Sequence, residues 1–174
     1  MERLIRVIAL CAWLVPAAST SAEHSLPRRV RIELDRAYPG WRRAAVSPDV
    51  ARLLRGHPAS AFRVEGDFDG DGRHDFAVQI LDPASGAAVR QRVVAALRRG
   101  GRSALFPLVS FPENRFTFLE TEARGTQVVD RSLDPERGVT LALAHDALFI
   151  ASDEKGGRTC VWTGKGFRCF VSSD

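Results

Sequence analysis

The stretch of residues 66–78 reads Gly66-Asp67-Phe68-Asp69-Gly70-Asp71-Gly72-Arg73-His74-Asp75-Phe76-Ala77-Val78. It places four aspartates within nine residues, and its glycines give the backbone the freedom to turn back on itself. In a compact loop, two carboxylates about 5 Å apart repel by roughly 3 kcal/mol at an effective dielectric constant of about 20. Several such pairs make a tight turn unstable unless a cation lies among them.

The oxygen atoms of this loop predict which cation it takes. The candidate ligands are the side chains of Asp67, Asp69, Asp71 and Asp75 and the backbone carbonyl of Arg73. Hard oxygen donors suit Ca²⁺ far better than zinc or copper. We therefore expect a calcium site, and the alternative is a solvated acidic turn that binds no metal.

The same stretch decides the fold, because apolar residues beside the loop have the spacing of strands. Phe76, Val78 and Ile80 alternate on one side of the segment that follows, and residues 61–65 lead into the loop. Alternation with a period of two is typical of a half-buried strand. The loop thus joins two strands.

Helical patterns come before this region. Residues 28–38 carry apolar side chains at helical spacing, and Pro39-Gly40 ends the run. Ser47-Pro48-Asp49 resembles a helix start, so a second short helix is predicted that stops at Gly56. Trp41 is either an exposed contact residue or a staple between the first helix and the sheet.

The remainder of the chain has a β pattern. Residues 87–99 fit a helix or a strand, and Gly100-Gly101, typical of a hairpin turn, favours the strand. Further strands are predicted at residues 104–111, 115–120, 126–129, 139–143, 147–151, 159–163 and 167–171. We expect an α+β domain built mainly on antiparallel sheet, with one or two short N-terminal helices.

Cys160 and Cys169 flank a predicted hairpin with a glycine-rich turn at Gly164-Lys165. With a two-residue turn, Cys160 lies opposite Cys169 and Trp162 lies opposite Phe167, all on one face. A disulfide that clamps the hairpin is then geometrically possible, and the alternative is two small buried hydrophobic residues.

Residues 1–22 resemble a secretory signal peptide. Arg3 and Arg6 precede an apolar stretch at residues 7–15, and small residues follow up to Glu23. The apolar stretch is too short to span a bilayer permanently. We expect residues 23–174 to form a single calcium-binding domain that is exported to the periplasm or the extracellular space, is monomeric and does not span the membrane.

The formal net charge of +4 is modest for 174 residues. Basic clusters at residues 28–31, 42–43 and 90–102 are read as solvated surface or as contacts for acidic polysaccharide, lipid headgroups or an acidic partner, and nucleic acid is not expected because an exported protein rarely meets it. The sequence offers no nucleophile elbow or zinc-protease motif. We therefore expect a protein without catalytic residues. A glycosidase pair among Glu113, Glu120, Glu122 and Asp130 stays open.

The run Asp67-Phe68-Asp69-Gly70-Asp71-Gly72-Arg73-His74-Asp75 resembles the loops of FG-GAP and VCBS-type repeats of integrin α-chains and bacterial surface proteins. In those families, repeated copies build a β-propeller, but one copy in a chain of this length does not imply a full propeller. Pro39-Gly40-Trp41, the single acidic loop and the closing motif at residues 162–167 are similar to short exported bacterial proteins of unknown role.

Two functions are consistent with these patterns. The first is an exported, non-enzymatic module whose calcium loop orders the fold and which binds a cell-envelope protein or an acidic glycan. The second is an envelope hydrolase, or an inhibitor of one, whose active surface lies outside the loop.

Overall fold

A computed structural model of the protein describes residues 26–44, 52, 60, 62–83, 88–112, 117–132, 134–152 and 156–173. The predicted signal peptide and, apart from Arg52, the predicted second helix lie outside these residues. The described part contains one α-helix, α1 (Arg28–Ala37), and antiparallel strands in three sheets, so the predicted α+β, mainly antiparallel class is confirmed. Within it, no helix has the length and apolar character needed to cross a membrane.

The first sheet is five-stranded. Its order is β1 (Arg42–Arg43), β3 (Asp75–Asp82), β4 (Arg90–Arg99) and β5 (Arg102–Pro112), and β2 (Arg63–Gly66) also pairs with β3. Within the ambiguous segment at residues 87–99, residues 90–99 form β4, which confirms the strand over that part. Gly100 and Gly101 have φ angles of 51° and 84°, which glycine adopts readily and which close the hairpin between β4 and β5.

The second sheet is four-stranded, in the order β11 (Phe167–Ser173), β10 (Gly157–Trp162), β9 (Ala147–Ser152) and β6 (Thr117–Glu122). A third, two-stranded sheet consists of β7 (Gln127–Asp130) and β8 (Val139–Ala142). A backbone bond from the Arg131 N–H to the Val171 carbonyl, 2.8 Å, holds this hairpin against β11.

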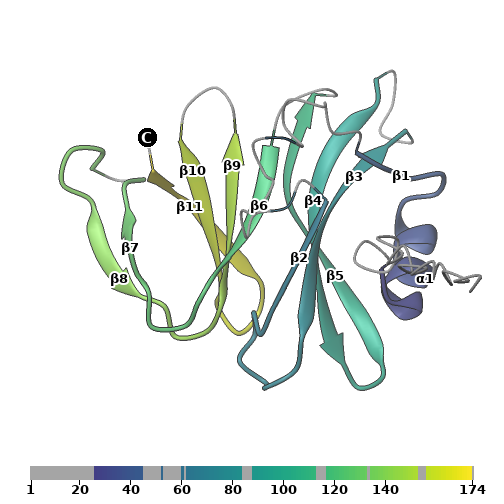
Figure 1. Ribbon diagram of the computed structural model, residues 1–174, viewed down its shortest axis with the longest axis horizontal. Helices are drawn as coiled ribbons and strands as arrows, with labels where there is room; N and C mark the ends of the chain where they lie inside the picture. Colours follow the sequence, from purple (N-terminus) through teal and green to yellow (C-terminus); the bar gives the residue numbers. More distant parts are fainter. Residues whose placement is uncertain are drawn as a thin grey trace, which may run out of the picture.

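The layers lie side by side in Figure 1, from α1 through the first and second sheets to the β7–β8 hairpin. The two large sheets share one apolar core, which includes Phe68, Leu97, Leu119 and Ile150. The opposite face of the first sheet packs against Val30 and Leu34 of α1. The first sheet is thus buried on both faces, which explains its nearly continuous apolar strands.

Trp41 joins the helix to the first sheet. Its side chain packs with the apolar cluster around Val30 and Leu34, and its indole N–H donates a 2.8 Å bond to Asp35. Of the two roles considered for Trp41, the contacts favour the staple.

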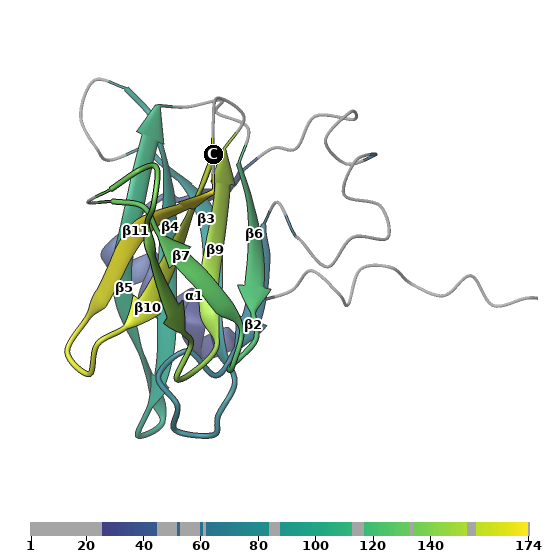
Figure 2. The ribbon, with the colours of Figure 1, turned by 90° about the vertical axis from the view of Figure 1, so that its left-hand side faces the viewer.

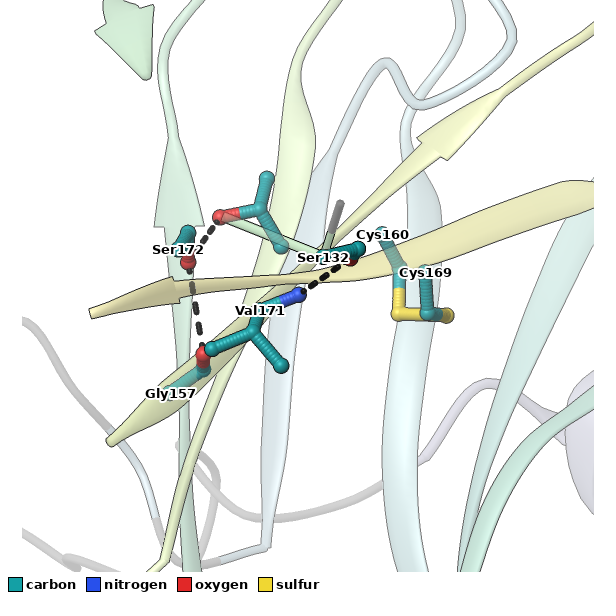
Figure 3. Close-up of a disulfide and its surroundings, with 7 residues drawn as sticks. Ser132, Gly157, Cys160, Cys169, Val171 and Ser172 are labelled. Atoms are coloured by element: carbon teal, nitrogen blue, oxygen red, sulfur yellow. Dashed lines mark hydrogen bonds between the residues drawn. A yellow bond between two sulfur atoms is a disulfide. The ribbon is translucent and has the colours of Figure 1, made fainter. Parts of the chain in front are cut away.

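The last hairpin has the predicted register. Cys160 lies opposite Cys169, Trp162 lies opposite Phe167, and a disulfide joins the two cysteines (Figure 3). All four side chains belong to the core between the large sheets. Beyond the disulfide, the Val171 N–H donates to the Ser132 hydroxyl at 3.2 Å, which ties the end of β11 to the segment after β7 (Figure 3).

Candidate metal site

The acidic loop (residues 67–75) connects β2 to β3, where Gly66 pairs with Asp75 at the mouth of the turn. In Figure 2 it lies at the lower end of the sandwich, beside the turn between β4 and β5. Phe68 points inward and is completely buried in the core between the sheets. The loop is therefore anchored at its second residue, which positions the aspartates on either side.

The structure groups three of the predicted ligands. One carboxylate oxygen from each of Asp67, Asp69 and Asp71 lies within 4.8 Å of the others. The loop is shaped by bonds from its own backbone to these carboxylates: the Gly72 N–H donates to Asp67 Oδ2 at 3.0 Å and the Arg73 N–H donates to Asp71 Oδ1 at 2.9 Å. Such side-chain bonds to nearby backbone are how aspartates stabilise tight turns.

Asp67 carries an unsatisfied oxygen. Its Oδ1 is buried and has no hydrogen-bond partner among the described residues, while its Oδ2 accepts from Gly72. A buried polar atom without a partner costs about 1–3 kcal/mol, and more when it is charged. A cation between the three carboxylates would remove that cost, so the residues present fit a hard metal ion.

Asp75, predicted as a fourth side-chain ligand, does not belong to this group. Its carboxylate is fully buried, with Oδ1 accepting from the Arg98 N–H at 2.7 Å and Oδ2 accepting from the Phe68 N–H at 3.1 Å. Burial and, to a lesser extent, the charge of Asp69 raise the pKa of Asp75 to about 6, against the lowering effect of the hydrogen bonds from the backbone. In this structure Asp75 fastens the loop to β4.

Arg73 was predicted to offer its carbonyl. The Arg73 side chain forms an ion pair with Asp71 at 3.7 Å, and the Arg73 backbone N–H donates to the same carboxylate. Its carbonyl as a ligand stays a prediction.

Two residues just before β9, His145 and Asp146, contact the loop from a distant part of the chain. Asp146, just before β9, accepts from the Asp67 N–H through Oδ2 at 2.9 Å and from the Arg124 N–H through Oδ1 at 3.0 Å. His145 lies against Gly70, so that a side chain at Gly70 would collide with its imidazole ring. These contacts attach the acidic loop to the second sheet.

Arg99, at the end of β4, connects the loop to an aromatic cluster. Its guanidinium lies 3.5 Å from Asp69 Oδ2 and 4.8 Å from the centre of the Trp162 ring. Trp162 in turn makes edge-to-face contacts with Phe106 and Phe167. The Asp69 side chain is only 8% exposed, so Arg99 gives this largely buried carboxylate a positive neighbour.

The structure does not bring all four of the carboxylates considered for glycoside hydrolysis together. Glu113 lies outside the described residues, and Asp130 is paired with Arg168. Glu120 and Glu122 are two residues apart in β6, so their side chains lie on the same face of the strand. Glu122 Oε2 is buried without a partner among the described residues, and burial raises the pKa of Glu122, with a bond from Thr159 lowering it and the charge of Glu120 raising it.

Comparison of the chain with models of protein families, with curated proteins and with solved structures finds no match.

Proposed function

We propose that the acidic loop binds Ca²⁺ and that the protein is an exported, non-enzymatic module which acts in the cell envelope. The observation that carries the proposal is Asp67 Oδ1, a buried carboxylate oxygen that has no hydrogen-bond partner among the described residues and belongs to one of three grouped aspartates. Acidic groups at a surface are common without metals, but a buried carboxylate oxygen without a hydrogen-bond partner is costly unless a cation pairs with it.

Asp67, Asp69 and Asp71 would supply the first oxygens around the ion, and the loop's sequence adds the Arg73 carbonyl and Asp75 as proposed ligands. An all-oxygen set of flexible carboxylates favours Ca²⁺, since Mg²⁺ requires a more regular octahedron and keeps more of its water. The ion would supply positive charge that lets the carboxylates approach one another.

The role of the ion is structural. The loop is bonded to β4 through Asp75 and to the second sheet through Asp146, so an ordered loop also fixes the end of the sandwich. Extracellular calcium modules commonly have dissociation constants near 10⁻⁴ to 10⁻³ M, so about tenfold excess calcium stabilises the fold by roughly 1.4 kcal/mol.

Export and the envelope partner rest on the sequence and the cysteines. Residues 1–22 have the pattern of a signal peptide, and the disulfide between Cys160 and Cys169 is compatible with an oxidising compartment. The partner we propose is a cell-envelope protein or an acidic glycan.

The test is thermal unfolding of the purified protein across a calcium series, with magnesium and chelator in parallel. Calcium should raise the Tm, and the double variant Asp69→Asn, Asp71→Asn should lose the rise. The matched control is Asp35→Asn, Asp134→Asn, because it removes the same charge while each aspartate accepts through Oδ1 alone, a role that Asn keeps. An equal Tm in saturating calcium and in chelator would refute the proposal.

A further inference from the structure

A second site lies beside the acidic loop, between the first turn of α1 and the outer face of the first sheet. It is a cavity of about 250 Å³. Apolar side chains line part of it, namely Pro27, Val30 and Phe76. Polar and basic side chains line the rest, namely Arg29, His74, Arg98 and Ser103.

Strand register explains why these residues meet. Phe76 pairs with Ala96, two residues before Arg98, and Arg98 pairs with Ser103 across the β4–β5 hairpin. Because side chains alternate along a strand, Phe76, Arg98 and Ser103 share one face, and it is the face that α1 covers. The helix begins at Arg28, which places Arg29 and Val30 over this end of the sheet.

The cavity has an unbalanced positive charge. Six other arginines have carboxylate partners within 4.0 Å, namely Arg36, Arg63, Arg73, Arg92, Arg99 and Arg168. Neither Arg29 nor Arg98 has one among the residues that the structure describes. Glu65, which lies opposite Phe76 across the strand pair, is itself paired with Arg63 at 3.1 Å.

We infer that this cavity binds the carboxylated sugar residue of an acidic glycan. Two guanidinium groups offer paired donors that match a carboxylate. The Phe76 ring and the aliphatic side chains offer a surface for the C–H face of the sugar, and Ser103 and His74 offer partners for its hydroxyls. Pockets for larger drug-sized ligands have volumes of about 300–1,000 Å³, so one sugar ring suits this smaller cavity.

This inference deepens the proposed envelope role, on which it rests for the source of the ligand. The cavity is separate from the group formed by Asp67, Asp69 and Asp71. It shares a wall with the loop, because His74 belongs to the loop and Asp75 accepts from the Arg98 N–H at 2.7 Å. The sugar would contact Arg98 and the other lining side chains directly, and Asp67, Asp69 and Asp71 are not among them.

The experiment is an NMR titration of the protein, recovered after expression of the full chain, with glucuronate, glucose and inorganic phosphate. Glucuronate should shift the backbone signals of residues around the cavity and should bind at least tenfold more tightly than glucose or phosphate. Equal affinity for glucose, or phosphate binding as tight as that of glucuronate, would overturn the inference, the latter because it indicates a simple anion site.

Variants complete the test. Arg98→Gln and Arg29→Gln should each weaken glucuronate binding about tenfold, and unchanged affinity in both would contradict the assignment. The matched control is Arg36→Gln, which removes the same charge from the far end of α1. Calcium binding is read from the Tm and glucuronate binding from the NMR shifts and the two arginine variants, so failure of the calcium proposal and failure of the sugar proposal are distinguishable.

Discussion

At the residue scale, Gly70 is the tightest point of the acidic loop. Its φ angle is +76°, and a Cβ there would collide with the imidazole ring of His145. We predict that Gly70→Ala lowers the free energy of unfolding by about 2–4 kcal/mol, of which roughly 1 kcal/mol comes from the left-handed backbone and the rest from the collision. Chemical denaturation with and without calcium measures this loss.

Gly72 provides the control, because its φ angle is +79° and a Cβ there would meet nothing within 4 Å. Gly72→Ala should cost only the backbone part, about 1 kcal/mol. Adding His145→Ala to Gly70→Ala should recover part of the lost stability. Equal losses for the two glycine variants would mean that His145 does not press on the loop.

The sequence was sufficient to find the loop but not its surroundings. Four aspartates within nine residues are a local signal, and three of them are grouped in the structure. Asp146 and Arg99 reach the loop through the folding of two different sheets, so no spacing in the sequence connects them with it. Asp75 was predicted as a side-chain ligand because of its position in the loop, whereas its contacts with Phe68 and Arg98 depend on tertiary structure.

At the element scale, the register of the hairpin of β10 and β11 was predictable to the residue. A two-residue turn fixes which residues face each other, and the observed bond from the Thr163 N–H to the Gly166 carbonyl closes that turn. The segment at residues 87–99 was harder, because its apolar residues fit both periods and only the glycine pair after it favoured a strand.

The disulfide of this hairpin should stabilise the whole domain. It links residues nine apart, and restricting a loop of this length in the unfolded chain stabilises a fold by about 2–3 kcal/mol. We predict that Cys160→Ala, Cys169→Ala lowers the free energy of unfolding by this amount in urea denaturation. Wild-type protein in reducing buffer should lose a similar amount, and equal stability of the oxidised and reduced wild type would contradict the prediction.

At the scale of the whole molecule, the alternation of apolar residues along a strand predicts which side chains are buried but not which element covers them. Val78 and Ile80 pack against α1, whereas Ala77, on the opposite face of the same strand, packs against the second sheet. Both faces of the first sheet are apolar, so the layer on each side is decided by contacts between elements far apart in the chain. The order of the strands could not be predicted from local patterns for the same reason.

Three hydrogen-bonded polar side chains lie in the core between the two large sheets. The Thr117 hydroxyl donates to Gln79 Oε1 at 2.6 Å and accepts from the Gln91 amide. These bonds join β6 of the second sheet to β3 and β4 of the first sheet. All three side chains are at most 3% exposed. A buried network of this kind is favourable only while each member keeps its partner.

Replacing Thr117 should therefore separate shape from hydrogen bonding. Thr117→Val keeps the volume but leaves the Gln79 oxygen and the Gln91 amide each without this partner, so we predict a loss of about 2–4 kcal/mol in the free energy of unfolding. Thr117→Ser keeps the hydroxyl and removes one methyl group, which should cost about 1 kcal/mol. Urea denaturation of both variants tests the prediction. If serine destabilises the protein as much as valine does, packing rather than the network holds the two sheets together at Thr117.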